Sequence, residues 1–136
     1  MQPDYTFFID RSLGRKHLAQ MLSEESEKYE LHDDHFSQDT PDVDWLKEVG
    51  KRGWVVFTKD KRIRHHQDEL NALLQANNAV FVFTGSKVTG PEIAEAYRIA
   101  LPQIKKILDK TQQRKFIAKV TKSGSVSVYK PKNEVH

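Results

Sequence analysis

Two aspartates stand next to runs of strand-forming residues, where an acid is unexpected. Asp10 directly follows Tyr5-Thr6-Phe7-Phe8-Ile9, and Asp60 follows Trp54-Val55-Val56-Phe57-Thr58 after a single lysine. A carboxylate beside a buried apolar strand is costly unless it is paired or used. Both positions therefore indicate functional groups rather than ordinary surface residues.

Two further acids lie between these runs. Asp42 and Asp44 fall in the first turn of an expected helix that Thr40-Pro41 opens, since proline suits the first helical position. Carboxylates gathered at one sheet edge repel one another unless a cation lies among them, and hard oxygen ligands favour Mg²⁺ or Mn²⁺. Such a centre is suited to metal-assisted phosphodiester hydrolysis. Both acids could instead only complement the helix dipole.

The elements that must position these acids alternate along the chain. Strands are expected at residues 5–9, 29–31, 54–58 and 79–84, with helices between them, followed by a hairpin of residues 116–120 and 126–129 across Ser123-Gly124. This alternation predicts an α/β fold with a mostly parallel sheet and helices on both faces. In such sheets functional groups gather beyond the carboxyl ends of the strands. Asp10, Asp42, Asp44 and Asp60 should therefore face one edge.

Composition limits the class of protein. The chain has 136 residues, 38% of them hydrophobic, and no cysteine, which excludes disulfides, thiolate zinc sites and cysteine nucleophiles. We expect one domain over residues 1–130 and a flexible tail over 131–136. No apolar run approaches the ~20 residues of a membrane-spanning helix. The first residues lack the basic region of a secretory signal, so a cytoplasmic protein without a membrane partner is expected.

Charge is divided unevenly along the chain. Residues 1–60 hold 8 Lys/Arg and 13 Asp/Glu, a net charge of −5, whereas residues 61–136 hold 14 and 6, a net charge of +8. A basic surface beside an acidic site would attract a phosphate backbone. A solvated basic helix face is the alternative interpretation.

Three segments together resemble a known family. Phe8-Ile9-Asp10-Arg11-Ser12-Leu13-Gly14-Arg15, Asp42-Val43-Asp44-Trp45-Leu46 and Gly53-Trp54-Val55-Val56-Phe57-Thr58-Lys59-Asp60-Lys61-Arg62-Ile63 resemble PIN-like nuclease domains. The likeness is to the compact branch near VapC-type toxins and the Mut7-C and DUF5615 families. It covers residues 5–85 by motif and the rest by the order of elements. The resemblance implies a three-layer α/β/α sandwich and hydrolysis of single-stranded RNA at a Mg²⁺ or Mn²⁺ site.

The family pattern implies roles for particular residues. Asp10, Asp42 and Asp60 match its catalytic, metal-binding acids, and Asp34 or Asp44 would supply a fourth ligand. Asp34 belongs to His32-Asp33-Asp34-His35, a loop that could also be merely solvated or, with its two imidazoles, bind zinc. The residues expected to contact RNA are Arg11, Lys59, Lys61, Arg62, Arg64 and His65.

The resemblance to VapC-type toxins implies an endoribonuclease restrained by an antitoxin-like protein. Formation of a homodimer is a further expectation that the sequence leaves open. One departure favours an alternative, a non-catalytic module that binds RNA or protein, because Arg11 stands where related families often carry an acid. A receiver-like domain is a further alternative, with Asp60 phosphorylated and Thr84 and Lys119 as its partners. Against it, receivers carry an acidic pair after the first strand.

Overall fold

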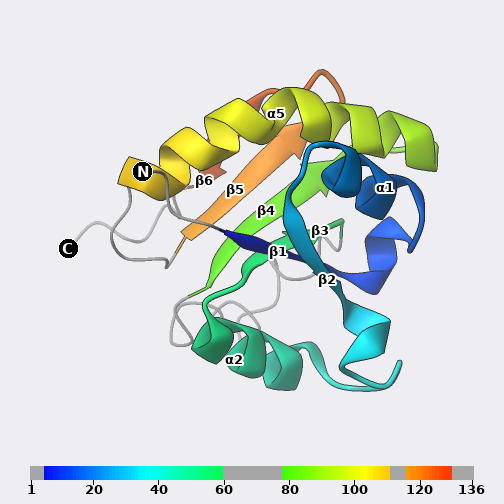
Figure 1. The fold of residues 1–136 in the computed structure, drawn as a ribbon, viewed down its shortest axis with the longest axis vertical. Coiled ribbons are helices and arrows are strands. Elements are labelled where there is room, and N and C mark those ends of the chain that lie inside the picture. The colour runs from blue at the N-terminus through cyan, green and yellow to red at the C-terminus, as the bar shows by residue number, and fades with distance from the viewer. Residues whose placement is uncertain (1–4, 60–77, 111–115, 130–136) are drawn as a thin grey trace.

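The computed structural model of the chain describes residues 5–59, 78–110 and 116–129 (Figure 1). Their strands form one sheet and are β1 (Thr6–Ile9), β2 (Lys28–Leu31), β3 (Val55–Thr58), β4 (Ala79–Thr84), β5 (Phe116–Thr121) and β6 (Val126–Tyr129). Their helices are α1 (His17–Glu24), α2 (Asp42–Arg52) and α5 (Gly90–Lys110), with 3-10 turns at Arg11–Leu13 and His32–Asp34. None of these helices is both long and apolar enough to span a bilayer.

The sheet is parallel over most of its width. Its strand order is β2-β1-β3-β4-β5-β6, and only β6 runs antiparallel to its neighbour. Phe8 pairs with Val56, and Val56 pairs with Val80, so β1, β3 and β4 end at the same edge. The chain changes its direction of winding between β1 and β3. In such sheets the crevice beyond the strand ends at this point is the usual ligand site.

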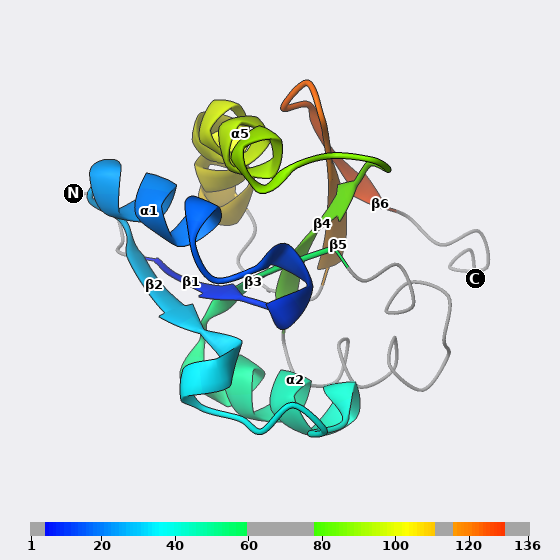
Figure 2. The same cartoon turned by 90° about the vertical axis from the view of Figure 1, so that its right-hand side faces the viewer.

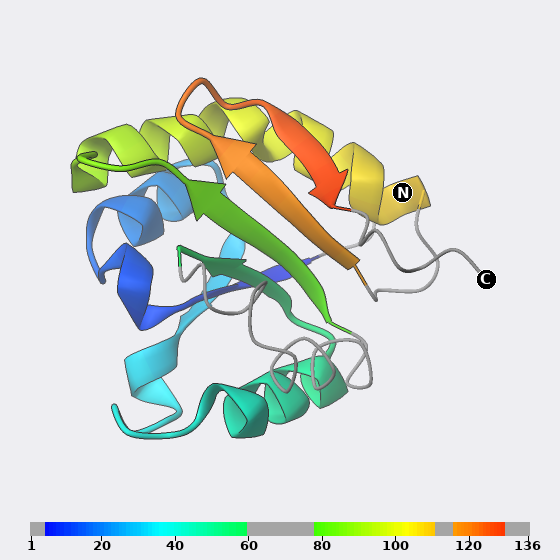
Figure 3. The same cartoon turned by 180° about the vertical axis from the view of Figure 1, so that it is seen from behind.

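Helices cover both faces of the sheet. Figure 2 shows α1 and α5 on one face and α2 on the other, and Figure 3 shows the same separation from behind. Alternation along the strands explains this arrangement, because successive side chains point to opposite faces. In β1, Phe7 and Ile9 join the core under α1 and α5, whereas Phe8 joins the core over α2. The predicted α/β/α sandwich is therefore confirmed.

Helix α2 is held by a short apolar stripe. Trp45, Leu46 and Val49 are all at most 1% exposed and pack against Phe8 and Val56. Burial of each such side chain contributes roughly 1.5–3 kcal/mol relative to leaving it in water. Gly53 ends the helix in the left-handed conformation at φ 72°, where glycine is favoured. The stripe thus fixes the first turn of α2 against the sheet.

Several local predictions can be compared with the structure. Thr89-Gly90-Pro91-Glu92 has the sequence spacing of a capping box, and the Thr89 and Glu92 side chains each accept the other's backbone N–H, at 3.3 and 2.9 Å. The hairpin turns at Gly124, as predicted. Ser12 is of a residue type that suits a helix N-cap and precedes the apolar residues of α1, but α1 begins at His17, and Ser12 lies in the turn after β1. The helix expected between the strands at 54–58 and 79–84, and the tail over 131–136, lie outside the described residues.

Candidate active site

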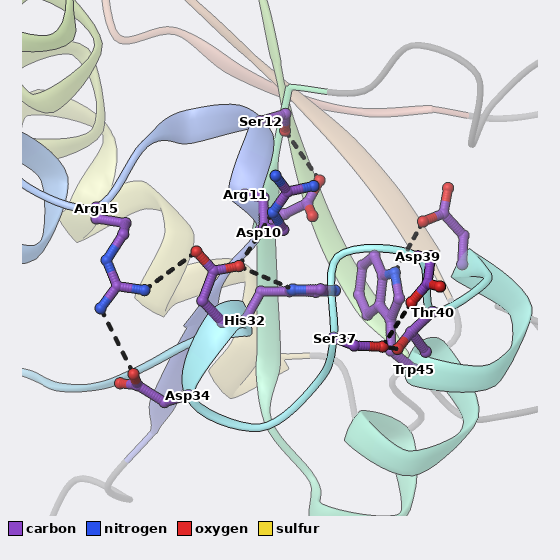
Figure 4. A network of polar contacts seen from close by, with 12 residues as sticks. Asp10, Arg11, Ser12, Arg15, His32, Asp34, Ser37, Asp39, Thr40 and Trp45 are labelled. Atoms are coloured by element: carbon purple, nitrogen blue, oxygen red, sulfur yellow. Dashed lines mark hydrogen bonds and ion pairs between the residues drawn. The ribbon is translucent and has the colours of Figure 1, made fainter.

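A cleft of about 600 Å³ opens at the carboxyl end of β1. Its walls come from the turn after β1, from His32 after β2, and from the loop and first turn that open α2. The lining residues are Asp10, Arg11, Ser12, His32, Gln38, Asp39, Thr40, Pro41, Asp42, Val43 and Trp45. Figure 4 shows the polar contacts around this region. Two of the predicted acids, Asp10 and Asp42, are therefore brought to one cleft.

Asp10 is placed by the sheet itself. Its backbone N–H donates to the Phe57 carbonyl at 3.0 Å, which continues the pairing of β1 with β3. Its side chain is buried, and Oδ2 accepts the hydroxyls of Thr58 at 2.7 Å and Ser12 at 2.9 Å. These donors offset the cost of burying the carboxylate. Both donors are neutral hydroxyls, so they bring no positive charge to the carboxylate.

Ser12 also links the two strand ends. Its hydroxyl accepts the backbone N–H of Lys59 at 3.0 Å while it donates to Asp10. Lys59 is half-buried and is the last described residue after β3. The loop after β3 is thereby tied to the acid after β1.

A buried tyrosine lies beneath this arrangement. The Tyr97 hydroxyl donates to the Phe81 carbonyl at 2.8 Å and also contacts the Thr58 carbonyl at 3.4 Å. Burial raises the pKa of Tyr97 well above its ordinary value, and the negative charge of Asp10 raises it further. Tyr97 is therefore a neutral donor that fixes the end of β3 from below.

Asp42 is placed by the first turn of α2. It follows Pro41, the residue that caps the helix, and its carboxylate lies near the positive end of the helix dipole. Its Oδ1 accepts the indole N–H of Trp45 at 2.8 Å. The side chain of Asp44 is exposed on the same turn and does not line the cleft.

A second acid near the cleft has cationic partners. Asp33 binds Arg11 Nε at 3.0 Å and Arg15 Nη1 at 3.1 Å, and Arg15 also reaches Asp34 at 3.5 Å. Slight burial raises the pKa of Asp33, but the hydrogen bonds of Arg15 and His32 and the charges of both arginines outweigh it, so the pKa lies below its ordinary value. Asp34 is therefore directed to Arg15 and is not among the residues that line the cleft.

The other predicted residues cannot be placed. Asp60, Lys61, Arg62, Arg64 and His65 lie outside the described residues. Within the described ranges, no group of three histidines or acids is close enough to hold a metal ion. The cleft is lined by the carboxylates of Asp10, Asp39 and Asp42 and by no thiolate, a set that fits Mg²⁺ or Mn²⁺ rather than a softer metal. Asp60, two residues after β3 along the chain, is the predicted third member.

Some residues of the site were not predicted from the sequence. Thr58 and Ser12 hold Asp10, and Asp39 lines the cleft with its carboxylate accepting the Ser37 hydroxyl at 2.8 Å. His32, which the sequence suggested only as part of a possible zinc loop, lines the cleft but is only 3% exposed, and its ring packs against Phe8 and Trp45. The hydroxyls carried a usable signal, since each lies within two residues of a predicted acid.

Comparisons with known proteins identify the family of this chain. The family of PIN-like domains matches residues 5–85. A protein of Mycobacterium tuberculosis named "Putative ribonuclease VapC45" is 26% identical over 115 aligned residues, which cover 76% of this chain and 83% of that protein. No solved structure matches the chain. The range that matches the family contains Asp10 and Asp42 as well as Asp60.

Proposed function

Because the chain belongs to the family of PIN-like domains, we propose that it is a metal-dependent ribonuclease that hydrolyses RNA phosphodiester bonds. The name of the similar protein from Mycobacterium tuberculosis supports a VapC-type role. The observation that carries the proposal is the meeting of Asp10 and Asp42 in one cleft, from segments 32 residues apart along the chain.

The acids have the chemistry of a hard-cation site. Asp10 and Asp42 would hold Mg²⁺ or Mn²⁺ together with Asp60, and Asp34 and Asp44 remain candidates for a fourth ligand. When bound, the cation lowers the pKa of water and shields the charge of the phosphate. Ser12 and Thr58 would keep the Asp10 carboxylate in one orientation throughout.

Basic side chains near the acids would bind the RNA backbone. Arg11 lines the cleft, and Lys59 ends the described segment after β3. In our proposal they contact phosphates together with Lys61, Arg62, Arg64 and His65. A guanidinium is suited to this task because it can donate two parallel hydrogen bonds to one phosphate.

A metal titration and a cleavage assay test the proposal together. We expect the wild-type chain to bind Mn²⁺ and to cleave single-stranded RNA, and Asp60→Asn to lose both properties while remaining folded. Glu48→Gln is a matched control, because it also removes one negative charge, in this case from α2, at a half-buried side chain that pairs with Arg52 and does not line the cleft. Normal cleavage by Asp60→Asn would contradict the proposed site.

The proposal extends to the biological setting. We place the activity in the cytoplasm and propose a protein partner that covers the cleft with an arginine or lysine, since such a cation would compete with the metal for the same oxygens. Expression of this chain alone in a bacterial host should slow growth, and the Asp60→Asn variant should not. Equal growth in cells that contain both soluble proteins would favour a non-catalytic role.

One observation supports that second candidate, a PIN-like module that binds RNA without cutting it. Arg11 lines the cleft directly beside Asp10, so a cationic group already lies near the proposed ligands. Mn²⁺ titration separates the two candidates. A catalytic site should bind Mn²⁺ more weakly in Asp10→Asn than in the wild type, whereas a non-catalytic module needs no such loss.

A further inference from the structure

The indole of Trp45 is the fixed partner of a proposed metal ligand. Trp45 is 1% exposed, and its indole N–H donates to Asp42 Oδ1 at 2.8 Å. The two residues are three apart in the first turn of α2, a spacing that places them on one helix face. A buried indole N–H needs an acceptor, and here the acceptor belongs to the cleft rather than to the core.

The indole cannot turn away from this carboxylate. Its ring lies against Phe8, with centroids 5.4 Å apart, and against His32, with centroids 5.6 Å apart and planes nearly perpendicular. Packing on several sides fixes the ring, and a fixed ring fixes the direction of its N–H. Asp42 itself is half-buried, and the indole N–H is a donor of fixed direction for its Oδ1.

We propose that Trp45 is a positioning residue that holds the Asp42 carboxylate in the orientation required to bind a divalent cation in the cleft. This inference rests on the proposed function. A neutral N–H is suited to the task, because it fixes the carboxylate without cancelling its charge. A lysine or arginine at the same place would compete with the cation.

The first test is a Mn²⁺ titration that compares the affinity of the wild-type chain with the affinities of its variants. We expect Trp45→Phe, which keeps an aromatic ring but lacks the N–H, to weaken Mn²⁺ binding by about 10- to 100-fold, as loss of an outer-shell partner does elsewhere. Trp54→Phe is the matched control, because Trp54 also packs on Phe8 but makes no described contact with Asp42. In an Asp42→Asn background, Trp45→Phe should have no further effect.

A second measurement needs neither metal nor a stable Trp45 variant. In the NMR spectrum of the metal-free chain, Asp42→Asn should shift the indole N–H resonance of Trp45 strongly, because a charged acceptor is replaced by a neutral one. Glu48→Gln, on the same helix, should leave that resonance in place. An unmoved Trp45 resonance in Asp42→Asn would overturn the contact on which the inference depends.

The outcomes separate the two levels of the argument. If wild type binds Mn²⁺ and folded Trp45→Phe binds it equally well, the inference about Trp45 is wrong and the proposed function stands. If wild type has no affinity for Mn²⁺, the proposed metal function fails and the role of Trp45 fails with it. Weaker binding in Trp45→Phe, with Trp54→Phe unchanged, supports the inference.

Discussion

Two acids follow neighbouring strands of this sheet and yet have opposite surroundings. Asp10, after β1, is 8% exposed and accepts hydrogen bonds from two hydroxyls. Asp33, shortly after β2, has a side chain 28% exposed and binds two arginines. Neutral donors leave the negative charge of a carboxylate uncompensated, so it can attract a cation. Guanidinium groups already compensate that charge.

The comparison shows that the position of a carboxylate and its ability to bind a metal cation are separate properties. Both acids lie beyond the carboxyl ends of parallel strands, so position alone would rank them equally. Their partners differ, since the described donors on Asp10 are neutral hydroxyls and those on Asp33 are guanidinium groups. We infer that the kind of donor on a carboxylate is a better indicator of a metal ligand here than its place at the sheet edge.

The largest expected effect follows from removing the charge of Asp10. Asp10→Asn should abolish Mn²⁺ binding and RNA cleavage, because a neutral amide is a weak ligand for a hard cation. The fold should survive, since the amide oxygen can still accept the hydroxyls of Ser12 and Thr58. Isothermal titration with Mn²⁺ and a melting curve would check both statements. A variant that unfolds would instead make Asp10 structural.

The sequence was sufficient to predict the frame of the site. Continuous apolar runs identified β1, β3 and β4, and their alternation with helices implied a parallel sheet. The rule of strand ends then placed Asp10 and Asp42 together, as the structure does. The strand order is shared with receiver-like folds, so the family match to residues 5–85, rather than the topology, favours the PIN-like interpretation.

The hydrogen-bond partners of these acids could not be predicted from the sequence pattern. Thr58 and Asp10 are 48 residues apart, and their contact depends on the register of β1 against β3 and on side-chain rotamers. Ser12 carries a hydroxyl that suits a helix cap equally well, and only the late start of α1 directs it to Asp10. Side-chain hydrogen bonds of this kind are set by tertiary packing, which a local pattern does not contain.

A second prediction concerns the neutral donors themselves. Thr58→Val keeps the shape of a fully buried side chain but removes one hydrogen bond to Asp10. We expect Mn²⁺ binding to weaken about 10-fold and the free energy of unfolding to fall by about 1–3 kcal/mol, the usual range for loss of one hydrogen bond to a buried charged group. Calorimetric titration and urea unfolding would measure the two losses. Full Mn²⁺ affinity in this variant would show that the donors on Asp10 do not prepare it for a cation.

A third prediction addresses the cationic side of the comparison. Asp33 contacts Arg11 at Nε. This contact leaves the edge formed by the two terminal nitrogens of the guanidinium for a phosphate. Arg11→Gln should therefore cost one phosphate contact, weaken RNA binding a few-fold and reduce the salt slope by about 0.7 for single-stranded RNA. Binding by fluorescence anisotropy at several salt concentrations, in an Asp60→Asn background to prevent cleavage, would measure this. An unchanged slope would mean that Asp33 occupies Arg11 fully.

The smallest effect is expected at Asp33. Asp33→Asn should leave Mn²⁺ affinity within about two-fold of wild type, because a carboxylate already paired with arginines contributes little to a cation site. Its cost in thermal stability should be slight, since the ion pairs are partly exposed and screened by salt. Folding lowers the pKa of Asp33, so its contribution is present above the ordinary value of 3.8 and is lost as the pH falls through the lowered one. The difference in Tm between wild type and Asp33→Asn should therefore shrink as the pH is taken from about 5 towards about 2. A large loss of Mn²⁺ affinity in this variant would remove the distinction between the two kinds of acid.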